Sequence, residues 1–322
     1  MVKRITIKDV AERANTSYQT VSRVINDKPD VSPETRKRVL KVIAELNYRP
    51  SMAATTRANP KTHIMAVAIS LYNEYLLYEG DPHLLRMIHG VDDALEIRNY
   101  SLLLTTIHFT NNNAIESRLL NRQLADGVII RLSMHDKGQT ATLLKEKGYP
   151  VVVIGHSDDP NIPSIRSDDE HGGYTQTQHL IALGHRNIGI ICGPESDPAT
   201  AMRRKGHNRA MTDSGLDPTR TPHVGGGYTV EGGYEAAAQL MQEAPDLTAI
   251  IAFSDTMAIG AMRWLRKQGY DVPGDVSVVG YDDIPNARRQ MTPLTTINIP
   301  SMEEGRRAVQ VLFDLIENRK VP

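Results

Sequence analysis

The sequence contains a single cysteine, Cys192, and no apolar run that approaches the roughly 20 residues of a membrane-spanning helix. Because the chain has no second cysteine, an intrachain disulfide is excluded, and we expect a reducing cytoplasm as the compartment. The N-terminus lacks the apolar core of a secretory signal, so we expect no export by that route. With 322 residues, the chain is longer than one ordinary domain and fits two or three.

The motifs of common enzyme sites are also missing. The chain has no phosphate-binding P-loop and no G-x-S-x-G nucleophile turn. The glycines at 225–227 and 232–233 do not follow the strand-to-helix fingerprint of a dinucleotide site. The 11 histidines are scattered, without an H-E-x-x-H motif or cysteine companions. We therefore expect a protein that is not an enzyme and that holds neither a cofactor nor a metal.

The formal net charge of −1 hides an uneven distribution along the chain. Residues 1–61 carry 13 Lys and Arg against 6 Asp and Glu, which gives +7. The remaining residues carry 24 Lys and Arg against 32 Asp and Glu, which gives −8. A basic N-terminal segment on an acidic body suits a module that binds a polyanion such as nucleic acid.

The segment from residue 5 to 26 has the pattern of two short helices joined by a tight turn. Thr6 followed by Asp9 is the pattern of a capping box at the start of a helix. Ser17 offers a second N-cap after a polar break, and apolar residues at helical spacing follow it. Two such helices form a helix-turn-helix, whose second helix lies in the major groove of DNA.

The exposed face of the predicted second helix carries side chains that can read base edges. Tyr18, Gln19 and Ser22 point away from the apolar stripe, and Arg23 reaches along its edge. Gln can pair bidentately with adenine and Arg with guanine. We therefore predict that this face reads DNA sequence.

A third helix is expected next, because Ser32-Pro33-Glu34 combines an N-cap, a proline at the first helical position and an acid in the first turn. Pro50 ends this helix, and the polar segment 51–61 is interpreted as a linker. The expected apolar face, which would close a three-helix core, consists of Val39, Leu40, Ile43 and Leu46.

From residue 62 onward, short apolar runs alternate with helical patterns, which predicts parallel βαβ units. The expected strands are Ile64–Ile69, Leu102–Ile107, Gly127–Ile130, Val151–Ile154, Ile188–Ile191, Ala249–Phe253 and Val276–Gly280. The expected helices are His83–Arg98, Ala114–Leu124, Thr140–Lys147, Gly172–Leu183, Ala199–Met211, Glu231–Met241, Asp255–Lys267 and Met302–Ile316. These elements exceed one ordinary sheet, so we expect two similar halves that divide near Gly184–Ile188, with ligands at the carboxyl ends of the strands.

The N-terminal segment resembles the lactose-repressor (LacI/GalR) family of DNA-binding regulators, and the resemblance continues through the body. In the N-terminal segment the matching runs are Thr6-Ile7-Lys8-Asp9-Val10-Ala11, Ser17 to Val24, Val31 to Val39 and Leu46-Asn47-Tyr48-Arg49-Pro50. In the body they are Leu180 to Arg186, Ile188 to Pro194, Phe253 to Gly260, Val272 to Asp283 and Pro293-Leu294-Thr295-Thr296.

The resemblance implies an α/β protein in which an all-α helix-turn-helix headpiece precedes a two-lobed, periplasmic-binding-protein-like body of doubly wound parallel sheets. The implied domains are 1–50 for DNA binding, 51–61 as a hinge and 62–322 for effector binding and dimerisation. It further implies a homodimer that binds a pseudo-palindromic operator in double-stranded DNA, close to the nucleoid. A small sugar, a mono- or disaccharide bound between the lobes, would control the protein allosterically.

The family motifs also imply which residues contact DNA. Arg57 stands where the family has a leucine that enters the minor groove, and Arg can instead read a narrow groove. The DNA-binding candidates are Thr6, Ser17, Tyr18, Gln19, Thr20, Ser22, Arg23, Asn26 and Arg57.

Effector candidates follow from the same resemblance, because a sugar site needs forked donors, carboxylates and an aromatic ring. Arg203, Asp282 and Tyr228 match family positions for these roles. The pair Ser254-Asp255 replaces the usual Asn-Asp of the family, and Tyr72 and Arg131 are chosen only because each follows a predicted strand.

Three alternatives stay open at this point. A sugar-binding receptor of the transport class could use the same body, but a helix-turn-helix and a missing signal peptide argue against it. An enzyme of carbohydrate metabolism with a regulatory head is disfavoured by the missing catalytic motifs. Within the leading interpretation, the effector could also be a purine or a sugar phosphate.

Overall fold

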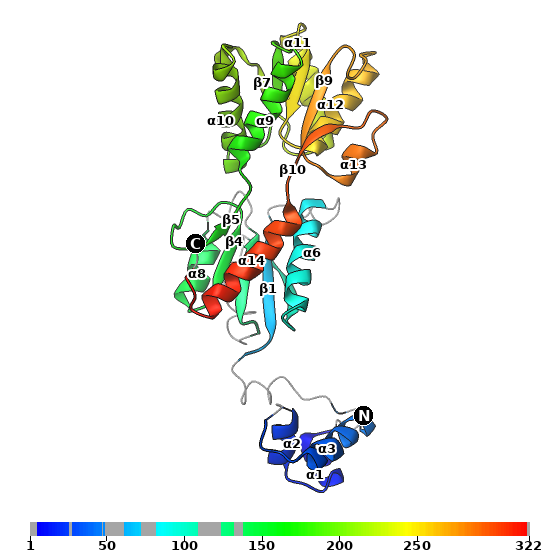
Figure 1. Ribbon diagram of the computed structural model, residues 1–322. Coiled ribbons are helices and arrows are strands. Elements are labelled where there is room, and N and C mark those ends of the chain that lie inside the picture. The colour runs from blue at the N-terminus through cyan, green and yellow to red at the C-terminus, as the bar shows by residue number, and fades with distance from the viewer. Residues whose placement is uncertain are drawn as a thin grey trace. The chain divides into compact units, whose positions relative to one another are not determined.

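The computed structural model describes residues 5–25, 28–46, 48, 61–71, 82–108, 124–131 and 138–320. The chain divides into two compact units, Met1–His63 and Ile64–Pro322, and each is described here by itself (Figure 1). The predictions for Asn26, Tyr72, Arg57 and the rest of the hinge up to residue 60, and for the helix at 114–124 up to residue 123, lie outside the described residues.

The described part of the first unit contains three helices, α1 (Ile7–Arg13), α2 (Tyr18–Ile25) and α3 (Pro33–Glu45). The predicted capping box is confirmed, since the Asp9 N–H donates to the Thr6 hydroxyl and the Asp9 carboxylate accepts from the Thr6 N–H. The Ser17 hydroxyl accepts from the backbone N–H of Thr20 in the first turn of α2. These caps fix where the first two helices begin and therefore the turn between them.

The core of the first unit differs from the prediction at one position on α3. Leu40 is 50% exposed, whereas Val39 and Val42 are buried and Ile43 and Leu46 are partly buried against the core. Residues one position apart on a helix point about 100° apart, so the stripe that begins at Val39 continues at Val42 and leaves Leu40 outside. The other buried members of this core are Val10, Ala11, Ala14, Val21, Val24 and Tyr48.

The strands in the described part of the second unit form two five-stranded sheets, and all of their pairs are parallel. All seven predicted strands are confirmed, and β5, β7 and β10 were not predicted. The first sheet has the order β2-β1-β3-β4-β5, with β1 (Ile64–Leu71), β2 (Ser101–His108), β3 (Gly127–Arg131), β4 (Val151–Ile154) and β5 (Ser164–Ile165). The second has the order β10-β9-β8-β6-β7, with β6 (Ile188–Cys192), β7 (His223–Gly225), β8 (Ala249–Ala252), β9 (Ser277–Asp282) and β10 (Thr295–Asn298).

Helices cover these sheets, and the predicted helices within the described residues are confirmed apart from their ends. Among the described residues of this unit, the α-helices are α6 (Pro82–Glu96), α8 (Gln139–Glu146), α9 (Asp169–Ala182), α10 (Pro198–Asp213), α11 (Val230–Glu243), α12 (Asp255–Lys267), the short α13 (Pro285–Arg288) and α14 (Ser301–Ile316).

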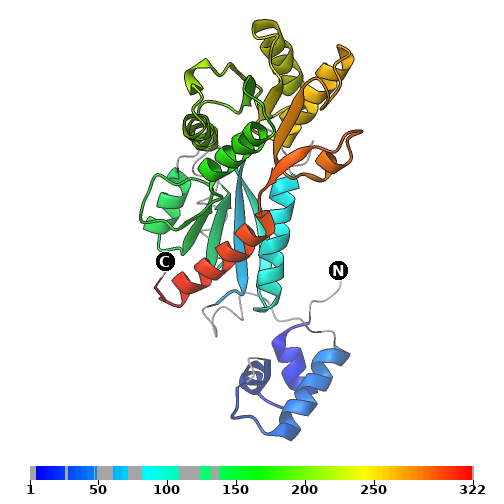
Figure 2. The same cartoon turned by 45° about the horizontal axis from the view of Figure 1, so that its top comes forward.

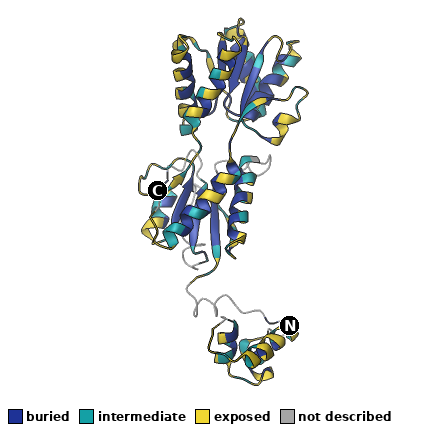
Figure 3. Cartoon of the chain, viewed as in Figure 1, coloured by how far each residue is buried: buried dark blue, intermediate teal, exposed yellow. Residues whose placement is uncertain are grey.

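The interior strands β1, β3 and β4 of the first sheet are buried on both faces (Figure 3). Along β1, Met65 and Val67 pack into the cluster that contains α6 and α14. Ala66 and Ala68, which alternate with them, pack into a second cluster that contains α8. A parallel sheet covered on both faces accounts for the nearly continuous apolar runs in the sequence.

The division between the two halves differs from the predicted break near Gly184–Ile188. Helix α9 packs against α10, β8 and β10, so the second half already begins at Asp169. The chain later returns, because α14 follows β10 but packs beside α6 and against the first sheet (Figures 1 and 2). The contact is close: a Cβ atom on Gly90 would lie 2.0 Å from the Met302 carbonyl oxygen. Apolar patterns mark elements but carry no information about which sheet an element joins, which is why this crossing was missed.

Candidate DNA-binding and effector-binding sites

The outer face of α2 presents the side chains that the sequence assigned to base readout. Tyr18 is 53% exposed, and Gln19 and Arg23 are exposed, while Val21 and Val24 on the opposite face are buried. Ser22 lies between these faces and is partly buried. The helix therefore offers one accessible face of donors and acceptors, as a major-groove helix requires.

Three other DNA-binding candidates form hydrogen bonds that shape the helices. Thr6 belongs to the capping box of α1, and the hydroxyls of Ser17 and Thr20 lie 2.9 Å apart at the start of α2. Their intramolecular role is to hold the two helices at fixed starting points. Contact with DNA stays a prediction for all three.

Arg23 forms an ion pair with Asp30, and both side chains are about half exposed. Exposed ion pairs contribute roughly 0–1 kcal/mol, because water screens the charges and two long side chains must be ordered. The guanidinium can therefore leave Asp30 for a base at little cost.

In the second unit, Arg203 of α10 is the centre of a buried polar cluster. Its Nε donates to the Asp169 carboxylate at 2.8 Å, and an Nη donates to the carbonyl oxygen of Phe253, the residue after β8. The guanidinium carbon lies 3.6 Å from the centroid of the Tyr281 ring on β9. Three elements thus hold Arg203 at the carboxyl ends of the second sheet, although only 7% of it is exposed.

Arg203 keeps its positive charge in this buried position. Burial by itself lowers the pKa of a guanidinium, but the charges of Asp169 and Asp282 oppose it, and the net effect is a raised pKa of Arg203. Burial raises the pKa of the Tyr281 hydroxyl, so that ring stays neutral beneath the cation. The cluster therefore presents a fixed, charged donor group next to an aromatic face.

Tyr228, in the turn before α11, and Asp282, the last residue of β9, both have an unusual backbone conformation. Tyr228 has φ 61° and Asp282 has φ 116°, in the left-handed half of the Ramachandran plot that side chains other than glycine seldom adopt. The Tyr228 hydroxyl donates to Asp197 at 2.7 Å, and its ring lies so close to Gly193 that a Cβ there would be 2.2 Å from Cζ. Strained residues of this kind cluster at functional sites.

Ser254 and Asp255 make their hydrogen bonds inside the second half of the unit. The Ser254 hydroxyl caps α12 by accepting from the Met257 N–H at 3.2 Å. The fully buried Asp255 accepts from the Ile284 N–H at 2.8 Å and from the Thr296 hydroxyl. Burial raises the pKa of Asp255 to about 6. Both residues tie α12 to its neighbours, and their contact with an effector stays a prediction.

Arg131 ends β3 in the first sheet and is partly buried beside Gly155, where a Cβ would lie 3.4 Å from an Nη atom. Its charge acts on Glu304 of α14, and so does the charge of Asp169. Arg131 and Arg203 were chosen separately from the sequence. Two acids connect them, because Arg131 acts on Glu304 and Arg203 binds Asp169, whose charge also acts on Glu304. Asp169, Tyr281 and Glu304 were not predicted from the sequence. Of the three, only Tyr281 lies in a run that matches the family, directly before Asp282.

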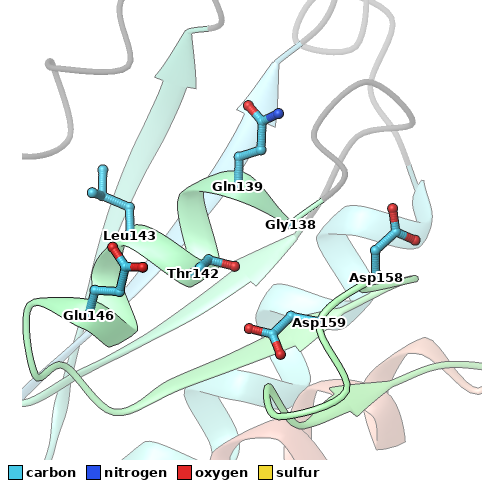
Figure 4. Close-up of a pocket in the computed structure, with 7 residues that line it drawn as sticks. All are labelled: Gly138, Gln139, Thr142, Leu143, Glu146, Asp158 and Asp159. Atoms are coloured by element: carbon cyan, nitrogen blue, oxygen red, sulfur yellow. The ribbon is translucent and has the colours of Figure 1, made fainter.

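A separate shallow pocket opens in the first half of the unit, at the start of α8 (Figure 4). It shares no residue with the Arg203 cluster, and its lining holds three carboxylates. Its lining residues are Gly138, Gln139, Thr142, Leu143, Glu146, Asp158 and Asp159. The chemistry of this pocket does not point to a ligand, so the Arg203 cluster is the stronger candidate site.

The described part of the chain also lacks two other kinds of feature. No helix there is long and apolar enough to span a membrane. No group of three or more His, Cys, Asp or Glu side chains there has the arrangement of a metal site.

Comparison with protein families gives two matches that together cover most of the chain. Residues 6–51 match the family of bacterial regulatory proteins of the lacI type. Residues 75–322 match the family of periplasmic binding proteins and sugar-binding domains of the LacI family.

Similar proteins extend over nearly the whole length. The transcriptional regulator CelR of Thermobifida fusca is 36% identical over 321 residues, which are 98% of this chain and 92% of that protein. Catabolite control protein A of Priestia megaterium is 33% identical over 322 residues, covering 98% and 94%. The repressor PurR of Haemophilus influenzae is 32% identical over 316 residues, covering 98% and 92%.

Solved structures agree with this similarity. The lac repressor dimer bound to operator and the anti-inducer ONPF aligns with a TM-score of 0.86 at 30% identity, covering 99% of this chain and 94% of that one. A complex of CelR with cellobiose aligns with a TM-score of 0.73 at 33% identity, covering 99% and 95%.

A helix-turn-helix unit joined to a two-sheet, periplasmic-binding-protein-like body defines this chain as a DNA-binding transcriptional regulator. The sequence identity to relatives over nearly the full length then identifies the family of the chain. The chain belongs to the LacI family of bacterial regulatory proteins.

Proposed function

We propose that the protein is a homodimeric repressor of carbohydrate-utilisation genes that acts on a pseudo-palindromic operator in the cytoplasm. A neutral mono- or disaccharide is its effector and binds at the Arg203 cluster. Arg203 supplies forked donors to hydroxyls, Asp282 accepts from hydroxyls, and Tyr228 offers a ring to the apolar face of the sugar.

The observation that carries this proposal is the fixed, charged state of the buried Arg203. A guanidinium has five N–H donors, and within the described residues two nitrogen atoms of Arg203 donate to Asp169 and Phe253. The remaining donors are oriented by these two bonds and by the Tyr281 ring, so a ligand that uses them pays little ordering entropy. The cellobiose bound by the relative CelR supports a saccharide of this size.

A purine effector is the second candidate, because PurR repressors are among the relatives at 32% identity. The two candidates differ in what they need from the site. A saccharide presents several hydroxyls to the donors of Arg203 and to carboxylates, whereas a purine presents one planar ring with ring nitrogens.

A thermal-shift screen of the full-length protein separates these candidates. Cellobiose, maltose, glucose, hypoxanthine and guanine are each added at increasing concentration. A ligand at 100 times its Kd stabilises the native state by about 2.7 kcal/mol, so the effector raises the melting temperature. We expect a saccharide to do so. A rise with a purine and with none of the saccharides would overturn the carbohydrate proposal.

A further inference from the structure

Glu304, in the first turn of α14, is a buried acid with an incomplete set of hydrogen bonds. Only 7% of the residue is exposed. Its Oε1 accepts from the Ser167 hydroxyl at 2.6 Å. Its Oε2 is buried and has no hydrogen-bond partner within the described structure, and the Nε2 atom of His83 lies 3.7 Å from it.

Such an oxygen is costly to keep in a folded protein. A buried acceptor without a donor has lost its hydrogen bonds to water and gained none in exchange, and this cost is larger for a charged group. Burial raises the pKa of Glu304, while Ser167 and the charge of Arg131 lower it. The later inward positions of α14, such as Ala308 and Leu312, are apolar and fully buried. An apolar residue at position 304 would therefore fit the pattern of the helix better, which indicates a functional reason for the acid.

The position of Glu304 connects it to the Arg203 cluster. Ser167, its hydrogen-bond donor, lies in the segment that leads from the first sheet into α9. Two residues later, Asp169 binds Arg203 at 2.8 Å, and its charge acts on Glu304. Glu304 therefore lies beside the Arg203 cluster, at the end that elements of the first sheet contribute. Arg131 lies at the same end.

We infer that Glu304 is an effector-binding residue, whose Oε2 accepts a hydrogen bond from a hydroxyl group of a neutral saccharide. The inference rests on the proposed carbohydrate function and specifies its chemistry. Because the Asp169 carboxylate is paired with Arg203 whereas Glu304 adds a further acid at this end of the site, a phosphorylated or carboxylated sugar is disfavoured beside Glu304 by like-charge repulsion. Glu304 would thus select against sugar phosphates.

The test compares three variants of the full-length protein by calorimetric titration with cellobiose, maltose and glucose. Glu304→Leu removes the acceptor, and Glu304→Gln keeps an uncharged oxygen. Glu303→Gln is the matched control, because Glu303 is the exposed neighbour, with 68% of its side chain accessible. A second titration uses glucose 6-phosphate.

We expect Glu304→Leu to weaken saccharide binding by at least about tenfold, as loss of a hydrogen bond to a charged group implies, while its melting temperature without ligand stays equal or rises. Glu304→Gln should bind with intermediate affinity, and should gain affinity for glucose 6-phosphate relative to the wild type. Glu303→Gln should match the wild type.

Unchanged saccharide affinity in Glu304→Leu would overturn the role of Glu304 and leave the carbohydrate proposal intact. A melting temperature that falls in step with affinity would show a structural role and would also overturn it. If the wild type binds none of the three saccharides, the proposed function fails, and the hydroxyl contact fails with it.

Discussion

His207 is a buried histidine whose neutral form is selected by its surroundings. It is fully buried on α10, and its Nδ1 and Nε2 lie 2.9 Å from the Thr177 hydroxyl and 3.2 Å from the Thr221 hydroxyl. Burial, with the charge of Arg204, lowers the pKa of His207 from 6.5 to about 4. His207, one turn after Arg203 on α10, is thus a packing residue whose contribution to stability is sensitive to acid.

This shift predicts a pH dependence of stability. Because the folded pKa lies below the unfolded pKa, the stabilisation is present above pH 6.5 and is lost as the pH falls toward 4. Between pH 7 and 5, the free energy of unfolding should fall by roughly 2 kcal/mol more in the wild type than in His207→Gln. Urea unfolding at both pH values measures this difference, with exposed His223→Gln as the control. Equal pH slopes in the wild type and His207→Gln would refute the assignment.

At the scale of elements, we expect α2 to act as the recognition helix, with a base readout that depends on Arg23. Arg23→Ala should weaken binding to a cognate DNA fragment by roughly 1–3 kcal/mol and relax the preference at one base position. Asp30→Asn removes the ion-pair partner of Arg23 and should change affinity by less than about 1 kcal/mol. Fluorescence anisotropy on cognate and random fragments measures both effects. An equal loss on both fragments in Arg23→Ala would assign Arg23 to phosphate contact.

The pair of helices α9 and α10 positions Asp169 and Arg203, and glycine makes their contact possible. A Cβ on Gly206 would lie 1.9 Å from the Glu170 carbonyl oxygen, so any side chain there must push the helices apart. Gly206→Ala should therefore lower the free energy of unfolding by roughly 1–3 kcal/mol and weaken effector binding as well. Gly225→Ala is the control, because no atom lies within 4 Å of a Cβ at that position. Stability equal to that of the control would contradict this packing role.

Whether a strand could be predicted from the sequence depends on whether it lies inside its sheet or at an edge. The seven predicted strands are mostly interior strands with long apolar runs, such as β4 with four buried residues. The three missed strands, β5, β7 and β10, are all edge strands of two to four residues and are only partly buried. An edge strand pairs on one side and carries a weaker apolar signal, so its sequence resembles a loop.

The residues of the candidate site could likewise be predicted only in part. Arg203, Tyr228 and Asp282 could be chosen because they match family positions. Asp169 and Glu304 could not, because their roles come from contacts over 34 and 137 residues of sequence. No local pattern encodes such contacts, and only the fold brings these residues together.

At the scale of the whole molecule, the chain passes between its two sheets twice in the described part of the body. It enters the second half before α9 and returns between β10 and α14. Asp169 and Glu304 each lie within five residues after one of these passages. A ligand held by residues at both passages can change how the two halves are arranged, and a ligand shifts an equilibrium only through its different affinity for the two states.

The proposed function requires that a saccharide bound at the Arg203 cluster controls DNA binding by the basic N-terminal unit. Its most direct test is the affinity of the full-length protein for a DNA fragment that it selects from a random pool, measured at fixed salt with and without saturating cellobiose, maltose or glucose. The comparison uses the wild type and the double variant Arg203→Gln/Asp169→Asn, which avoids leaving one buried charge unpaired.

We expect one saccharide to change the wild-type affinity for DNA by at least about tenfold, within the usual range of allosteric coupling, and to leave the double variant unchanged. The double variant should still bind the fragment without saccharide as the wild type does, because its substitutions lie outside the first unit. A saccharide that binds the wild type but leaves its DNA affinity unchanged would show that the saccharide does not control DNA binding. A saccharide that acts equally on the double variant would show that it does not act through the Arg203 cluster.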